Sequence, residues 1–145
     1  MPASGGGSSA GATHELVEHV AEVRVRLRAP SYAGLVAEAG RALGALALRG
    51  RAGRARPEWR EVEVSSADRA ALLVDWINEL VFLAERDLWV PTEFQVECTG
   101  PAAVRARARG VELDEAPALV KAATFDRLTL QERDGMLEAE VTLDV

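Results

Sequence analysis

The residues best suited to bind a metal ion are carboxylates near the two ends of the chain. Glu22 opens the first expected strand, Asp144 is the penultimate residue, and Val145 supplies a terminal carboxylate. If the first and last strands lie side by side, three hard oxygen donors converge. Clustered carboxylates are costly to leave unpaired, and Mg²⁺ or Ca²⁺ would neutralise them. The spacing thus allows a divalent-metal site, on the condition that these strands are neighbours.

The other reactive side chains give no catalytic pattern. His14 is expected to be an incidental surface residue near an N-terminal tail. His19 precedes the first strand, without a second His or Cys nearby to complete a zinc site. Cys98 has the apolar parity of its strand, which predicts a buried, inert thiol. No serine elbow or glycine-rich phosphate loop is present. We therefore predict no catalytic residues.

Two arginine stripes offer a second kind of chemistry. Arginines alternate with apolar residues at 24, 26 and 28, and again at 105, 107 and 109. They would bind phosphates if the two strands were neighbours, or else form solvated outer faces that discourage edge-to-edge pairing. The second interpretation is favoured because the net charge is −6 and no aromatic residues are interleaved. Strong nucleic-acid binding and membrane binding are therefore not expected.

The element that must support these groups is a long helix. Residues 65–90 are apolar over most of the helical circumference, which predicts a helix in the middle of the core. Ser65 and Asp68 have the spacing of a capping box at its start. A narrow polar stripe remains at Asp75, Asn78 and Glu79.

A second helix and several strands are expected around it. Ser31 is the predicted cap of a helix over 32–48, whose glycines weaken it unless they allow close packing. Alternating residues predict strands at 22–28, 59–64, 94–98 and 104–109. Asp134-Gly135 predicts a type I′ hairpin. Its register, continued outward, sets Leu128 opposite Val141, Asp126 opposite Leu143 and Phe125 opposite Asp144.

The order β, α, β, α, β, β, β, β indicates an α+β fold, with two helices packed on mostly antiparallel β-sheet. The 145 residues suit one domain. Residues 1–13 form a Gly/Ser/Ala tail that we expect to be disordered, residues 14–145 form the domain, and its first structured piece begins near Leu16. One cysteine, no secretory signal and no long apolar run together suggest a cytoplasmic protein.

Four segments, in order along the chain, resemble the archease family. They are EHVAEVRVR at 18–26, LLVDWINELVFL at 72–83, VKAATFDRL at 120–128 and VTLDV at 141–145. The resemblance spans residues 18–145, and its most specific part is the helix with Asp75, Trp76, Asn78 and Glu79.

The resemblance implies a non-enzymatic partner of the RNA-splicing ligase that joins 2′,3′-cyclic phosphate or 3′-phosphate ends to 5′-hydroxyl ends. Archeases promote guanylylation and multiple turnover of that ligase in tRNA splicing and RNA repair. The family holds a divalent ion with the acid that ends a His-Thr-Ala-Asp motif and with the last two residues. These positions are Glu22, Asp144 and Val145 here, so Ca²⁺, Mg²⁺ or Mn²⁺ is the expected cofactor.

The chain departs from the family at two motifs. His-Thr-Ala-Asp appears as residues 19–22 with Glu22 in place of Asp, and Lys-Ala-x-Thr-Tyr-His appears as residues 121–126 with Phe125 and Asp126 at its end. His19, Lys121 and Asp126 are further candidate site residues. Two alternatives stay open: a standalone metal-dependent hydrolase that uses Glu22, Asp126 and Asp144, and a diverged binding module without a metal.

Overall fold

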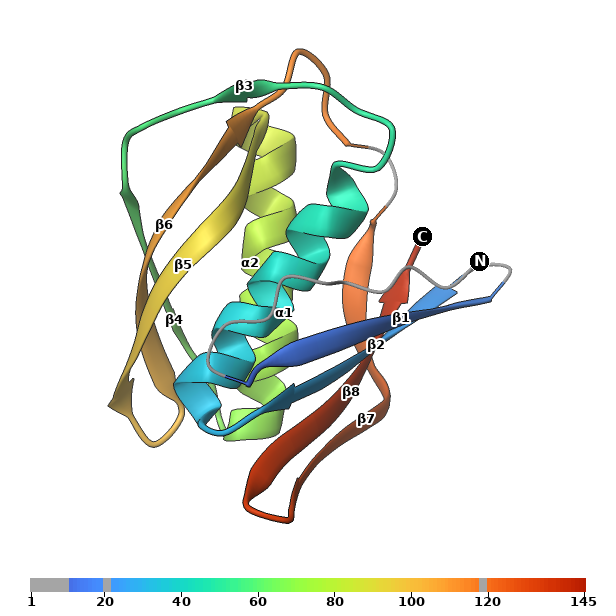
Figure 1. Ribbon diagram of the computed structural model, residues 1–145, viewed down its shortest axis with the longest axis vertical. Helices are drawn as coiled ribbons and strands as arrows, with labels where there is room; N and C mark the ends of the chain where they lie inside the picture. Colours follow the sequence, from blue (N-terminus) through green and yellow to red (C-terminus); the bar gives the residue numbers. More distant parts are fainter. Residues whose placement is uncertain (1–10, 20–21, 118–119) are drawn as a thin grey trace.

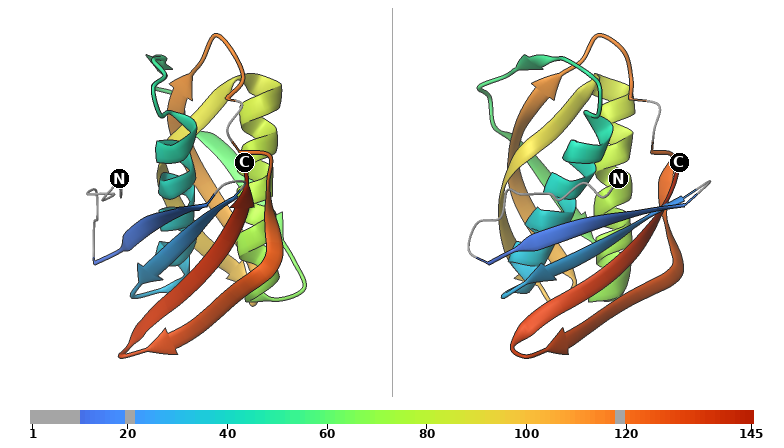
Figure 2. Two further views of the ribbon diagram at one scale, coloured as in Figure 1. Left: turned by 90° about the vertical axis from the view of Figure 1, so that its right-hand side faces the viewer. Right: turned by 45° about the vertical axis from the view of Figure 1, so that its right-hand side comes forward.

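The computed structural model describes residues 11–19, 22–117 and 120–145. Within them, two four-stranded sheets enclose two helices, and the helices lie between the sheets (Figures 1 and 2). This confirms the predicted α+β class. No helix of the described residues is long and apolar enough to cross a membrane.

The first sheet brings the beginning and the end of the chain together. It has the order β1-β2-β8-β7, and each pair is antiparallel. Its strands are β1 (Thr13–His19), β2 (Glu22–Ala29), β7 (Ala122–Arg133) and β8 (Met136–Asp144). The condition for the metal site is therefore met, because β2 pairs with β8.

The second sheet is built around β6 (Ala103–Glu112). The long strand β5 (Trp89–Gly100) pairs along one edge of β6 as the predicted hairpin. The strands β4 (Arg60–Ser65) and β3 (Arg54–Ala55) pair with different parts of β6. The arginine stripes of residues 24–28 and 105–109 therefore lie in different sheets and do not combine into one phosphate-binding face.

Helix α1 (Tyr32–Ala47) begins at the predicted cap, where the Ser31 Oγ accepts a hydrogen bond from the Gly34 amide. It packs against β2 and β5. Close packing is what its glycines allow: a Cβ atom on Gly40 would lie 2.6 Å from the Phe94 ring, and one on Gly44 would lie 2.8 Å from the Pro91 carbonyl oxygen.

Helix α2 (Arg69–Asp87) is the predicted core helix. Its Trp76 is fully buried and meets the Phe94 ring edge-on, with 5.8 Å between the ring centroids. The predicted capping box at Ser65 is wrong, because Ser65 ends β4. Asp68 is the cap instead, and its carboxylate accepts a hydrogen bond from the Ala71 amide at 2.8 Å.

Other sequence-based expectations were also wrong. The strands β1 and β3 were not predicted, because neither carries a clear apolar alternation. Cys98 is exposed rather than buried, since the end of β5 extends beyond its buried part. Most of the predicted tail, residues 1–10, lies outside the described residues.

The terminal hairpin keeps its predicted register only near the turn. Glu132 pairs with Leu137 and Leu130 with Ala139 as expected, and Asp134 and Gly135 both have the positive φ of a type I′ turn. Beyond Thr129 the register shifts, so that Thr124 pairs with Thr142, and Ala122 rather than Phe125 lies opposite Asp144. Residues 125–128 form a bulge, which no local sequence signal indicated.

Candidate functional site

The predicted metal ligands lie in one row across the first sheet. Glu22 pairs directly with Asp144, His19 pairs with Glu22 on the other side, and Ala122 pairs with Asp144. Directly opposite residues in antiparallel strands point to the same face. Val23 and Leu143, the next pair along, are buried in the core. The carboxylates of Glu22 and Asp144 therefore face outward, away from the helices.

This row places like charges opposite each other. Carboxylates in directly opposed positions have Cβ atoms about 5 Å apart and destabilise a sheet unless something compensates them. Glu22 is 26 % exposed, and its Oε1 lies 3.5 Å from the Nη1 of Arg127. One guanidinium thus contacts one of the two opposed carboxylates.

A buried hydroxyl lies beside this row. Thr142 precedes Asp144 by two residues, so it belongs to the same face of β8, yet it is only 1 % exposed. Its Oγ1 has no hydrogen-bond partner within the described residues. A buried hydroxyl without a partner is unfavourable, so this position suits a bound water or ion. In the neighbouring row, the carboxylates of Glu22 and Asp144 are hard oxygen donors of the kind that suits a small divalent cation.

The three further candidates differ in their position. The backbone amide of Lys121 donates to the Asp144 carbonyl at 2.9 Å, which joins the start of β7 to the end of β8. Asp126 lies in the bulge, 3.9 Å from Arg127. No group of three His, Cys, Asp or Glu residues able to hold a metal occurs in the described residues, so Asp126 does not join Glu22 and Asp144. The side chain of His19 lies outside what the structure describes.

The polar stripe of α2 contacts β7, the strand next to the acidic row. Asn78 accepts a hydrogen bond from the Ala123 amide at 2.7 Å and donates one to the Ala123 carbonyl at 3.3 Å. The helix thereby binds the edge strand β7 as another strand would. Asp75 accepts a hydrogen bond from Ser66 at 2.6 Å. The sequence revealed the stripe but not these structural roles.

A second polar cluster was missed altogether. His14, expected on the surface, is 6 % exposed, and its Nδ1 lies 2.5 Å from Oε2 of Glu38, whose side chain is completely buried. Arg41 also donates to Glu38. Burial would raise the pKa of Glu38, but the hydrogen bonds from His14 and Arg41 lower it below its ordinary value. The cluster joins β1 to α1, and a buried glutamate in the middle of α1 was its only sequence signal.

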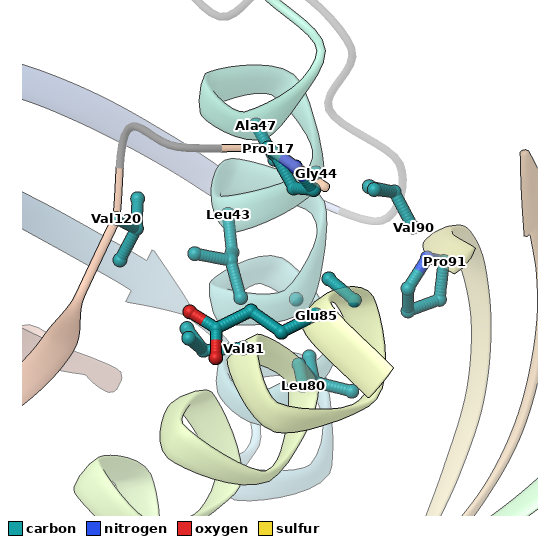
Figure 3. Close-up of a pocket in the computed structure, with 12 residues that line it drawn as sticks. Leu43, Gly44, Ala47, Leu80, Val81, Glu85, Val90, Pro91, Pro117 and Val120 are labelled. Atoms are coloured by element: carbon teal, nitrogen blue, oxygen red, sulfur yellow. The ribbon is translucent and has the colours of Figure 1, made fainter. Parts of the chain in front are cut away.

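An apolar pocket lies elsewhere, between the C-terminal halves of the helices (Figure 3). The space is small, about 20 Å³, room for about one water molecule, and Glu85 is the only charged residue among the described residues that line it. Its other lining residues come from α1, α2, the start of β5 and the segment before β7: Gly40, Leu43, Gly44, Ala47, Leu80, Val81, Ala84, Val90, Pro91, Pro117 and Val120. No predicted site residue lies in it.

The archease protein family (MTH1598/TM1083) matches residues 14–145. This chain belongs to the archease family. The archease of Methanopyrus kandleri is 31 % identical over 138 residues, which cover 90 % of this chain and 98 % of the relative. The archease of Methanothermobacter thermautotrophicus is 34 % identical over 94 residues, which cover 61 % of this chain and 67 % of the relative.

Solved structures agree with the archease assignment. The solution structure of Methanobacterium thermoautotrophicum protein 1598 superposes with a TM-score of 0.73 at 25 % identity, and covers 91 % of this chain and 98 % of its own. The crystal structure of an archease from Thermotoga maritima, described as a possible chaperone, has a TM-score of 0.63 at 18 % identity, and covers 89 % of this chain and 94 % of its own. The second likeness supports the archease fold alone.

Proposed function

We propose that this archease is an accessory protein that activates an RNA-splicing ligase in tRNA splicing or RNA repair, by promoting its guanylylation and multiple turnover in the cytoplasm. The observation that carries the proposal is the pairing of Glu22 with Asp144, in a chain that belongs to the archease family. An acidic pair at this position has no evident use in holding the sheet together, since directly opposed like charges destabilise it.

Glu22, Asp144 and the terminal carboxylate of Val145 would hold the divalent ion, with Ca²⁺, Mg²⁺ or Mn²⁺ as candidates. When bound, the ion would neutralise these carboxylates and place positive charge at the sheet surface. The hydrogen bond from the Lys121 amide to the Asp144 carbonyl fixes the end of β8. Asn78 fixes β7 through Ala123, two residues from Lys121. Helix α2 would thereby support the proposed site through β7.

Activation of a partner has a thermodynamic requirement. An accessory protein shifts the ligase toward a GTP-reactive state only if it binds that state more tightly than the others. The acidic row, together with the exposed Phe125 in the bulge of β7 at 60 % exposure, would offer a surface for that discrimination.

The direct test is the rate of ligase guanylylation with GTP and Mn²⁺, measured with and without this protein. We expect faster guanylylation with the wild type and none of the increase with Asp144→Asn. Glu138→Gln is the matched control, since it removes the same charge from the outer face of the same strand, where Glu138 pairs with Arg28 and Arg133. Equal ligase rates with and without the wild type, over a range of GTP concentrations, would contradict the proposal.

One alternative has a specific observation in its favour. Because Arg127 contacts Glu22, the chain is also compatible with a diverged binding module that balances its acidic row without a metal. Thermal melting with Ca²⁺, Mg²⁺ or Mn²⁺ separates the two, since a bound ion raises the melting temperature by mass action. The hydrolase alternative is disfavoured, because Asp126 does not lie with Glu22 and Asp144.

A further inference from the structure

The contact between Arg127 and Glu22 joins two strands that are not neighbours. Arg127 belongs to β7 and Glu22 to β2, and β8 lies between them in the sheet. The arginine side chain therefore crosses the outer face of β8 near its end, where Thr142 and Asp144 lie. A surface arginine would form a shorter-range pair more easily, as Arg133 does with Glu138 on the adjacent strand.

The backbone of β7 is irregular at Arg127, which allows its side chain to extend to Glu22. Residues 125–128 of β7 lie opposite the single residue Val141, and Arg127 has a φ of 57°. The left-handed region is unfavourable for a non-glycine residue, and bulges commonly re-aim a side chain next to a functional site. The bulge also sets Asp126 beside Arg127, with 3.9 Å between Asp126 Oδ2 and Arg127 Nε.

We propose that Arg127 is a tethered counter-ion of the metal site: its guanidinium occupies the Glu22 carboxylate until a divalent ion displaces it. This inference rests on the proposed function, because it requires that the acidic row binds an ion. Displaced from Glu22, the guanidinium keeps a partner in Asp126. Binding of the ion therefore exchanges one cation for another on Glu22 and exposes a guanidinium beside the site.

The exchange weakens metal binding and makes it depend on ionic strength. The pair is partly exposed, with side-chain exposures of 58 % for Arg127 and 26 % for Glu22. Breaking it is therefore a modest cost, and repulsion between the guanidinium and the ion adds to that cost. Salt screens both contributions.

The test measures Mn²⁺ affinity directly, by electron paramagnetic resonance of the free ion, for the wild-type chain and five variants. Arg127→Gln removes the cation and should tighten Mn²⁺ binding by roughly threefold to tenfold at low ionic strength. Arg127→Lys retains a cation and should stay within about twofold of the wild type. Arg133→Gln is the matched control: it changes the net charge equally, on the same strand, at a pair of the same 3.5 Å length. Glu22→Gln should bind weakly.

Arg127→Gly protects the test against misfolding, since glycine removes the cation and also relieves the left-handed backbone. It should match Arg127→Gln in affinity, and the gain of both should shrink in 1 M KCl. Equal affinities for the wild type, Arg127→Gln, Arg127→Gly and Arg133→Gln, with weak binding by Glu22→Gln, would overturn the counter-ion role and leave the metal site standing. Absence of binding in every variant would overturn the metal site as well.

Discussion

The outer faces of the two sheets differ in one row of charged residues. On the second sheet the central strand β6 presents Arg105 between Glu63 of β4 and Glu97 of β5, and Arg109 opposite Glu93. The corresponding ion pairs are 2.8–3.3 Å long. On the first sheet, Arg26 and Arg28 of β2 likewise face Glu140 and Glu138 of β8. The last row of that sheet breaks the pattern, because Glu22 faces Asp144.

Rows of opposite charge and rows of like charge affect a sheet differently. Rows of opposite charge stabilise their sheet slightly and need nothing more. A row of like charge costs stability unless a cation compensates it, as Arg127 does in part at Glu22. The acidic row also lies where β2 pairs with β8, next to β7, which α2 supports.

The largest effect, on metal affinity, should come from neutralising one carboxylate of the acidic row formed by Glu22 and Asp144. Asp144→Asn removes one of the charged ligands, and we expect metal affinity to fall on the order of a hundredfold. Without metal the variant should be at least as stable as the wild type, because the repulsion with Glu22 is relieved. With ion at 100 times the dissociation constant, only the wild type should gain about 2.7 kcal/mol in unfolding free energy.

Calorimetric titration and melting, each with and without Ca²⁺ or Mn²⁺, provide these values. Glu140→Gln on the same strand is the control, since Glu140 pairs with Arg24 at 3.2 Å in a matched region. It should leave metal affinity nearly unchanged. If Asp144→Asn melted far below the wild type in the absence of metal, Asp144 would be a structural residue and the contrast between the two faces would fail.

The next effect concerns the support of the acidic row. Asn78→Ala leaves the amide and the carbonyl of Ala123 without their side-chain partner, at a residue that is 6 % exposed. We expect a loss of about 1–3 kcal/mol in unfolding free energy, measured by urea denaturation. Asn78→Asp keeps the acceptor for the Ala123 amide and should lose less. A loss in Asn78→Ala no larger than that in Asn78→Asp would show that β7 does not depend on the helix.

The sequence predicted the elements that have strong local signals. The periodicity of residues 69–87, the cap at Ser31 and the Asp134-Gly135 turn each depend on neighbours within a few residues, and each was confirmed apart from the exact start of α2. The pairing of Glu22 with Asp144 was only conditional, because nothing local fixes which strands are adjacent. The family resemblance, and not the spacing, supplied its functional meaning.

Features that depend on long-range contacts could not be predicted. His14 resembled part of a polar tail because its partner, Glu38, is 24 residues away in the chain. The bulge at residues 125–128 left no local mark, since neither glycine nor proline occurs in it. The resulting error in register hid the contact of Arg127 with Glu22, which is 105 residues away.

The smallest expected effect tests the matched face of the second sheet. The hydrogen bond from Arg105 lowers the pKa of Glu63, and the charge of Arg105 acts in the same direction. A carboxyl group whose pKa is lower in the folded state stabilises the protein above its ordinary pKa of about 4.3, and this contribution is lost as the pH falls through the lowered pKa. Melting temperatures of the wild type should therefore decline more steeply than those of Glu63→Gln as the pH falls below about 4.3. The difference should be small because the pair is exposed.

Glu61→Gln, which removes a carboxylate 3.9 Å from Arg105, is the comparison. Coinciding melting curves for Glu63→Gln and the wild type across this pH range would mean that the matched rows contribute nothing to folding, and only the acidic row would then distinguish the two faces.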